Sequence, residues 1–228
     1  MEKINLIVAA MEVELNALLN EIAEYEEIKV KGETLYRFER NNKVYYAGLG
    51  KIGKVHTAVY LTKMIESLDI ERIFNIGTSG GINKDLTTRD VIIATKVGYY
   101  DVDVTDFDYK LGQMCGCPQY FSCDTEYIKN NLRKSDLSLI EGIVLSGDTF
   151  MNREKYLKSN LVKLEDDILA CEMESGAVGQ VCYIYNIPFV VIRSISDIVT
   201  RDNNNFEEHV SNADETSTNS ARALLQLI

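Results

Sequence analysis

The chain has 228 residues, of which 46% are hydrophobic and 26% are charged, and this is enough for one domain with a full core. Its formal net charge of −11 is spread along the sequence and repels phosphate backbones and anionic lipids, so nucleic acids and membranes are not expected partners. No run reaches the roughly 18 apolar residues of a spanning helix, and the N-terminal residues do not form a secretory signal. We therefore expect a soluble, cytoplasmic protein whose partner is a small molecule.

The five cysteines predict neither a disulfide framework nor a zinc site, because their spacing contains no paired C-x-x-C motif. Cys115 and Cys117 could together bind a metal, but His56 and His209 lie far from them in the sequence and leave too few ligands. We expect reduced thiols, no metal and no cofactor.

Apolar runs that alternate with helical periods predict an α/β domain with a mixed central sheet. Residues 4–10 are almost wholly apolar, as in a strand buried on both faces, and the apolar positions of residues 15–22 then follow a helical period. Asn41-Asn42 separates two short apolar segments, 35–38 and 44–47, and indicates a hairpin. Further strands are predicted at residues 73–76, 91–94, 143–145 and 189–192, and further helices after Gly53 and at residues 124–132, 174–185 and 206–225.

No linker or internal repeat interrupts the sequence, and its one polar tract, at residues 201–205, is short. Residues 1–228 are therefore expected to form a single domain. Residues 99–120 are aromatic and acidic without a clear period, which is typical of either a functional loop or a subunit interface.

Ligands of α/β sheets bind beyond the carboxyl ends of strands, so the residues that follow each apolar run are the candidates for chemistry. Four segments qualify, at residues 11–14, 77–81, 146–150 and 193–197. Each also has an ordinary explanation. The acids of the first segment are favoured in the first turn of a helix whether or not they bind a ligand. The glycines of the second segment could form a structural turn, and Phe150 could pack in the core instead of stacking on a base.

Arg193 ends an apolar run, where it needs an anionic or polar partner, and a structural salt bridge is as good an interpretation as a site. Asp197 could equally cap a helix. Glu172 and Glu174 would point to nearly opposite sides of a helix, so at most one of them is expected to face a given pocket. His56 and His209 are interpreted as surface or packing residues rather than acid catalysts.

Seven short motifs follow one another along the chain. They are AMEVE (10–14), IGKV (52–55), NIGTSGG (75–81), DVDVTDF (101–107), SGDTF (146–150), EME (172–174) and RSISD (193–197). Taken in this order, they make the sequence resemble, almost end to end, the 5′-methylthioadenosine/S-adenosylhomocysteine nucleosidases of the nucleoside phosphorylase superfamily. The resemblance implies a three-layer α/β/α sandwich, a homodimer, no metal, and release of adenine from methylthioadenosine, S-adenosylhomocysteine and usually 5′-deoxyadenosine.

The resemblance also implies roles for single residues. Asp197, oriented by Ser196, would protonate adenine N7, and Glu14 would activate the attacking water, which Arg193 and Thr78 would help to position. Glu174 would accept hydrogen bonds from the ribose hydroxyls, Met173 would pack on the sugar, and Phe150 would stack on adenine. Met151 would read the edge of the base, and Glu172 would belong to the substrate-binding residues. Ile52 and Phe206 would form the apolar pocket for the 5′ substituent, and Met11 would form its wall. Val104 and Phe107 would reach into the site of the neighbouring subunit.

Two rival functions stay open at this point. A phosphorylase of the same superfamily would use phosphate in place of water and would need basic residues to hold it, of which Arg193 is the only candidate found. A nucleoside-binding protein could keep the fold without turnover, although the joint presence of Glu14, Glu174 and Asp197 argues against it.

Overall fold

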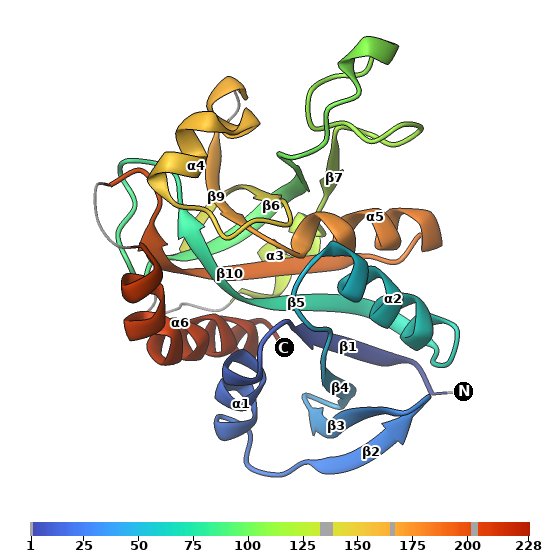
Figure 1. Cartoon of the computed structure of the whole chain (residues 1–228). Helices are drawn as coiled ribbons and strands as arrows, with labels where there is room; N and C mark the ends of the chain where they lie inside the picture. The colour runs from blue at the N-terminus through green and yellow to red at the C-terminus, as the bar shows by residue number, and fades with distance from the viewer. Residues whose placement is uncertain (1, 133–138, 165–166, 202–204) are drawn as a thin grey trace.

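The chain forms a mixed β-sheet with helices on both faces, as Figure 1 shows for this computed structural model. The structure describes residues 2–132, 139–164, 167–201 and 205–228. The strands are β1 (Ile4–Ala9), β2 (Glu26–Val30), β3 (Glu33–Arg40), β4 (Lys43–Leu49), β5 (Ile70–Gly81), β6 (Val91–Tyr99), β7 (Tyr120–Ser122), β8 (Leu139–Ser146), β9 (Ile168–Glu172) and β10 (Phe189–Ile198).

The sheet has the order β10-β6-β8-β9-β5-β1-β4-β3-β2, with β7 paired to β6. An additional parallel pairing joins β10 to β5, so five strands (β5, β9, β8, β6 and β10) close into a ring. The remaining strands extend from β1 as a parallel pair with β4 followed by antiparallel β3 and β2. The predicted mixed sheet is therefore confirmed, and its closure at one end is a feature that the sequence patterns did not indicate.

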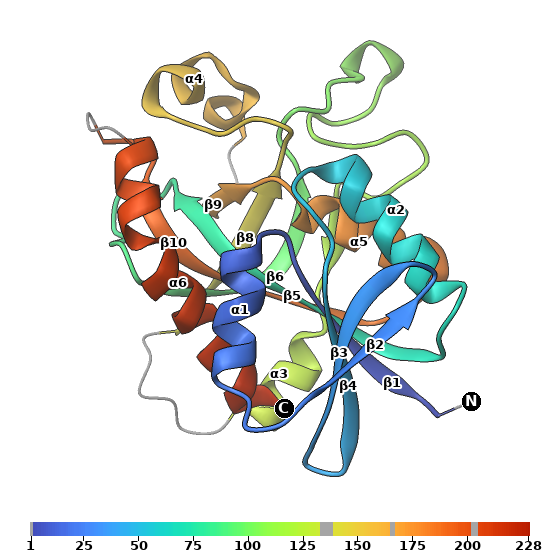
Figure 2. The same ribbon diagram turned by 60° about the horizontal axis from the view of Figure 1, so that its bottom comes forward.

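The helices lie in two groups on opposite faces of the sheet (Figure 2). One group contains α1, α3 and α6, and the other contains α2 and α5, so the structure has the three layers that the resemblance implied. No helix among the described residues has both the length and the hydrophobicity needed to cross a bilayer. The helix bounds are α1 (Glu12–Asn20), α2 (Lys54–Ile65), α3 (Thr125–Asn131), α4 (Arg153–Lys158), α5 (Ser175–Tyr185) and α6 (Asn205–Leu227), with 3₁₀ turns at Thr105–Phe107 and Asn160–Lys163.

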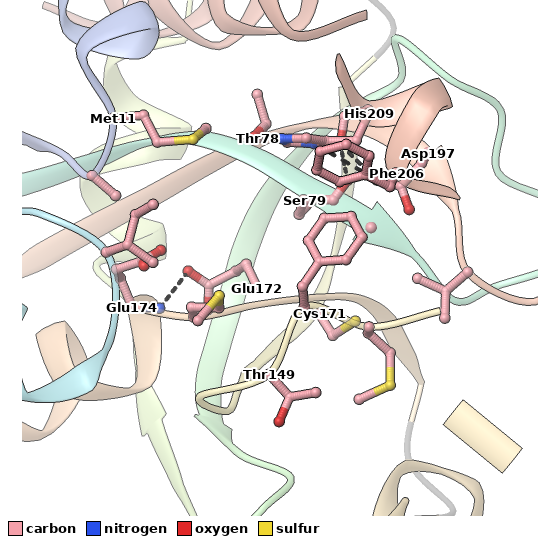
Figure 3. Close-up of a pocket in the computed structure, with 18 of the residues that line it drawn as sticks. Met11, Thr78, Ser79, Thr149, Cys171, Glu172, Glu174, Asp197, Phe206 and His209 are labelled. Atoms are coloured by element: carbon pink, nitrogen blue, oxygen red, sulfur yellow. Dashed lines mark hydrogen bonds and ion pairs between the residues drawn. The ribbon is translucent and has the colours of Figure 1, made fainter. Parts of the chain in front are cut away.

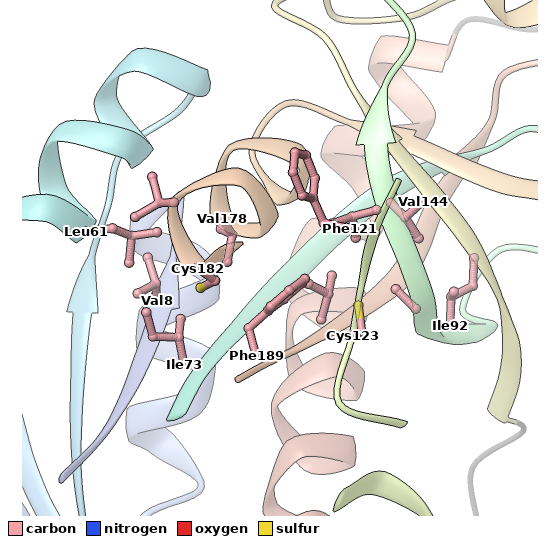
Figure 4. Packing of buried hydrophobic residues seen from close by; sticks show 14 of the residues in the cluster. Val8, Leu61, Ile73, Ile92, Phe121, Cys123, Val144, Val178, Cys182 and Phe189 are labelled. Carbon is pink, nitrogen blue, oxygen red and sulfur yellow. The ribbon is translucent and has the colours of Figure 1, made fainter. Parts of the chain in front are cut away.

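Alternate side chains of each central strand supply two separate cores, because successive residues of a strand point to opposite faces. Leu6 and Val8 of β1 pack in the cluster beneath α2 and α5, which Figure 4 shows around Leu61 and Cys182. Ile7 of the same strand belongs to the cluster beneath α1 and α6. Burial on both faces explains why β1 reads as a continuous apolar run rather than an alternating one.

The predicted strands and helices are all present, but two bounds differ in a way that matters for the site. Residues 77–81 and 193–197, expected after the ends of their strands, lie inside β5 and β10, because these two strands pair with each other beyond their apolar stretches. β2, β7, β9 and α4 were not predicted. The polar tract at residues 201–205 falls largely outside the described residues.

A pair of substitutions on α6 tests the packing of this helix on the sheet. Leu224 is fully buried, whereas Arg222, two residues away, is exposed and pairs with Glu21. We expect Leu224→Ala to lower the free energy of unfolding by about 2–5 kcal/mol and Arg222→Ala by less than about 1 kcal/mol. Urea denaturation followed by circular dichroism measures both, and equal losses would contradict this packing.

Candidate active site

A cavity of about 340 Å³ opens where the ends of five strands or their following loops converge (Figure 3). It is lined by residues that follow β1 and β8, by residues of β5 and β10, and by the end of β9 with the start of α5. The cavity is called the pocket below. Its lining residues are Ala10, Met11, Glu14, Ile52, Thr78, Ser79, Gly80, Thr149, Phe150, Met151, Cys171, Glu172, Met173, Glu174, Ser196, Asp197, Val199, Phe206, His209 and Val210.

Glu14 is buried in the first turn of α1, and donors surround its carboxylate. One oxygen accepts hydrogen bonds from the backbone N–H groups of Ala10 and Met11, each at 3.0 Å. The other accepts from the backbone N–H of Thr78 at 2.8 Å and from its hydroxyl at 3.3 Å. A Cβ at position 77 would lie 2.5 Å from the Glu14 Oε1 atom, so Gly77 is what allows this carboxylate to approach β5.

Glu172 and Arg193 form an ion pair beneath the pocket, with a distance of 2.6 Å between Oε2 and Nη2. Both side chains are almost fully buried. The Arg193 guanidinium also donates to Asn75 Oδ1 at 2.5 Å, and Glu172 accepts further bonds from the hydroxyls of Ser146 and Ser175. Burial alone would raise the pKa of Glu172, but the Arg193 charge and these hydrogen bonds hold it below its ordinary value.

Arg193 is fully buried and is not among the residues that line the pocket, and its role in positioning the attacking water stays a prediction. Its partners are Glu172 and Asn75, so its first effect is to neutralise and orient Glu172. The alternative interpretation from the sequence, a structural salt bridge, describes these contacts better.

Glu174 lies at the N-cap of α5, and its carboxylate accepts a hydrogen bond from the backbone N–H of Gly53 at 2.8 Å. Burial, together with the negative charge of nearby Glu172, raises the pKa of Glu174. The assumption that Glu172 and Glu174 share a helix was wrong, because Glu172 ends β9 and α5 begins only at Ser175. Both residues therefore line the pocket.

Asp197 follows an irregularity in the pairing of β10 with β5, where Ile195 pairs with Ser79 and Asp197 with Gly80. Ser196 is the extra residue of this bulge, and bulges redirect the side chains around them. The Ser196 hydroxyl donates to Asp197 Oδ1 at 2.8 Å, and the Asn205 amide donates to Oδ2 at 3.1 Å. Burial raises the pKa of Asp197, and these two hydrogen bonds offset part of the rise.

The rest of the pocket wall is mainly apolar. The rings of Phe150 and Phe206 meet edge to face with centroids 5.9 Å apart, and Ile52 is about half exposed at 48%. Among the described lining residues there is no lysine or arginine. A search of the described residues also finds no group of three histidine, cysteine or acidic side chains placed to hold a metal.

The structure brings twelve of the fifteen expected site residues to the pocket. The exceptions are Arg193 and the pair Val104 and Phe107, which lie away from the pocket of their own chain; the Phe107 side chain is 74% exposed. The twelve are Met11, Glu14, Ile52, Thr78, Phe150, Met151, Glu172, Met173, Glu174, Ser196, Asp197 and Phe206.

Five polar residues at or beside the pocket were missed, and two of them, Ser79 and Thr149, lie within motifs named above. Asn205 contacts the Asp197 carboxylate, Cys171 lines the wall, and His209 lies 2.9 Å from the Ser196 hydroxyl, although the sequence was interpreted as placing it at the surface or in packing. A signal for His209 was present. It follows Phe206 by three residues, so both lie on one face of α6.

Comparisons with known proteins agree with this geometry. A family model described as the phosphorylase superfamily matches residues 6–228. A protein from Desulfotalea psychrophila, described as a 5′-methylthioadenosine/S-adenosylhomocysteine nucleosidase, is 35% identical over 97% of this chain and 95% of its own. A protein from Exiguobacterium with the same description is 33% identical over 96% of this chain and 94% of its own.

A solved structure from Borrelia burgdorferi carries the same description and is bound to adenine. It superposes with a TM-score of 0.90 at 32% identity, and the match covers 98% of both chains. The nucleoside phosphorylase-like fold expected from the sequence is thereby confirmed. The chain belongs to the phosphorylase superfamily and, within it, to the 5′-methylthioadenosine/S-adenosylhomocysteine nucleosidases.

Proposed function

We propose that this protein hydrolyses the N-glycosidic bond of 5′-methylthioadenosine and S-adenosylhomocysteine, and releases adenine and the thioribose product. The observation that carries the proposal is the placement of Asp197 and Glu174 on opposite sides of one mostly apolar pocket (Figure 3). A nucleoside spans these sides, with its base near Asp197 and its ribose near Glu174. The relatives named above support the same substrates.

Asp197 acts on the base. Adenine leaves poorly as an anion, so a proton delivered to N7 as the glycosidic bond breaks lowers the barrier. The carboxyl group must hold that proton before the reaction, and the raised pKa of the buried Asp197 favours the protonated form. Phe150, at the mouth of the pocket, supplies a flat face on which the base stacks.

Glu14 and Glu174 act on the other half of the reaction. As the base leaves, positive charge grows on the ribose, and nearby carboxylates stabilise it. Glu174 accepts hydrogen bonds from the ribose hydroxyls, while Glu14, which Thr78 orients, takes a proton from the attacking water. Arg193 acts through Glu172, which also accepts the backbone N–H of Glu174 at 3.0 Å.

The pocket does not favour a phosphorylase. A phosphate nucleophile needs positively charged partners, and the described lining residues contain carboxylates and no lysine or arginine. An apolar 5′ region likewise suits a thioether and disfavours a phosphate ester. The joint presence of Glu14, Glu174 and Asp197 in one pocket argues against a binding protein without turnover.

The proposal includes a homodimer in which Val104 and Phe107 complete the neighbouring site. Phe107 ends a 3₁₀ turn, and its ring is exposed although it is large and apolar. Neither residue contributes to the pocket of its own chain. Aromatic side chains are enriched at protein interfaces relative to the rest of the surface, and this supports the proposed dimer.

The first test is release of free base by the purified protein. Methylthioadenosine, S-adenosylhomocysteine, inosine and AMP are incubated with and without phosphate, and free base is measured by chromatography. We expect adenine from the first two substrates at rates that phosphate does not change. A requirement for phosphate would show a phosphorylase, and tight binding of methylthioadenosine with no release would show a binding protein.

Asp197→Asn tests the acid. The amide has nearly the shape of the carboxyl group but carries no transferable proton, so we expect kcat to fall by roughly 10² to 10⁴. Adenine binding, measured by calorimetry, should change much less. Near-normal turnover in this variant would exclude Asp197 as the proton donor.

The same variant tests the raised pKa through stability. Because folding raises the pKa of Asp197, its contribution to stability is fully present below its unfolded pKa and is lost as pH rises through the folded value. Asparagine does not titrate. We therefore expect Asp197→Asn to gain stability relative to the wild type between about pH 4, which is close to the unfolded pKa of an aspartic acid, and pH 8. Urea denaturation at both pH values measures the difference, and a constant or shrinking difference would contradict the raised pKa.

A further inference from the structure

We propose that His209 is a positioning residue that reloads the acid of this site, by passing a proton through the Ser196 hydroxyl to Asp197. The inference rests on the proposed function, because it concerns how Asp197 recovers the proton that it gives to the base. It assigns a role to a side chain that the sequence analysis interpreted as a surface or packing residue.

A continuous chain of hydrogen bonds carries the proposal. His209 Nδ1 lies 2.9 Å from Ser196 Oγ, and Ser196 Oγ lies 2.8 Å from Asp197 Oδ1. The direct distance from Nδ1 to Oδ1 is 3.9 Å, so the hydroxyl bridges the two groups. Asp197 is 2% exposed, whereas the His209 side chain is 19% exposed, so the imidazole connects the buried acid to solvent.

The proton balance closes over the three groups. After Asp197 has given its proton to the base, it is a carboxylate that accepts the Ser196 O–H, and the His209 imidazolium donates Nδ1–H to Ser196 Oγ. The hydroxyl proton then moves to Oδ1 and the Nδ1 proton moves to Oγ. Asp197 ends as the neutral acid and His209 as the neutral imidazole, which takes a new proton from water. Imidazole is suited to this step because it exchanges protons near neutral pH.

The group of opposite charge that faces His209 is the Asp197 carboxylate of β10, with 3.9 Å between Nδ1 and Oδ1. Glu208 precedes His209 on α6 and acts on Asp197, and Cys171 of β9 lines the same pocket. Glu208 accepts the backbone N–H of Ile198 at 3.4 Å, so its carboxylate stays beside this segment. From the other elements around the pocket, β5 presents Ser79 and the loop after β8 presents Phe150, neither of which is ionisable; the Phe150 ring lies 5.6 Å from the imidazole.

The alternative is that α6 only anchors the bulge of β10. Asn212, on the same helix face as His209, donates to the backbone carbonyl of Ser196 at 2.9 Å, and this contact carries no proton toward Asp197. Asn212→Ala is therefore a matched control, since it weakens the same anchoring and leaves the His209–Ser196–Asp197 chain in place.

The experiment compares kcat for adenine release from methylthioadenosine between pH 6 and pH 9. His209→Asn keeps a side-chain N–H that can donate to Ser196 but cannot pass a proton on, and His209→Phe keeps an aromatic ring without a hydrogen bond. Without the relay, Asp197 depends on direct protonation by water, which slows as pH rises. We expect both variants to stay within about twofold of the wild-type kcat at pH 6 and to fall about tenfold below it at pH 8.5.

Two further measurements separate a relay from a structural role. Free imidazole should restore the alkaline activity of His209→Ala and leave His209→Phe, whose ring fills the space, unchanged. Asn212→Ala should keep the wild-type shape of the pH profile. His209 variants with wild-type profiles, a similar alkaline loss in Asn212→Ala, or no rescue by imidazole would each overturn the relay while leaving the proposed function intact. If the wild-type protein releases no adenine, the proposed function fails and the relay fails with it.

Discussion

The buried ion pair between Arg193 and Glu172 is the interaction on which the rest of the site depends. It joins β10 to β9, and through Asn75 it reaches β5, so three strands of the closed ring meet at one guanidinium. Glu172 also accepts the backbone N–H groups of Glu174 and Ser175, which fixes the start of α5. Two charges buried in this way are costly unless each is paired, and removal of one partner leaves the other unpaired. The pair therefore sets the position of Glu174, even though Arg193 itself does not reach the pocket.

This pairing also divides the carboxyl groups of the pocket into two kinds. Glu172 is neutralised by Arg193, and its pKa lies below the ordinary value. Among the described residues no arginine or lysine forms an ion pair with Glu174 or Asp197, and burial raises the pKa of each. Neighbouring acids whose environments separate their pKa values are a recognised means of giving similar groups different roles. Under the proposed function, Glu172 serves structure, Glu174 binds the sugar and Asp197 donates a proton.

Local sequence patterns predicted most of the fold because buried strands and amphipathic helices have distinct periods. β1 and β8 could be recognised as apolar runs. β9 could not, because it is only five residues long and ends in Glu172, one of the acids of the site. β5 and β10 contribute to the pocket because they continue to pair with each other after their apolar residues end. Pairing between strands far apart in the sequence produces no local sequence pattern, so this extension could not be predicted. Most of the site residues were found through the family resemblance. The sequence offered a structural salt bridge for Arg193, but neither route supplied its partner Glu172 or the contact of His209 with Ser196, because both contacts join residues on separate elements.

The bulge at Ser196 allows two adjacent side chains of β10, those of Ser196 and Asp197, to reach the pocket together. In a regular strand Ser196 and Asp197 would point to opposite faces, and only one of them could serve the pocket. The extra residue changes this alternation, so both side chains line the same cavity and hydrogen-bond to each other. α6 then covers the irregular segment, with Asn205 on the carboxylate and Asn212 on the backbone of Ser196. An irregular strand buried without these partners would leave polar groups unsatisfied, and each such group costs free energy. The helix that stabilises the bulge is thus also the element that can bring an imidazole to the acid, so the stability of this segment and its proton supply depend on the same face of α6.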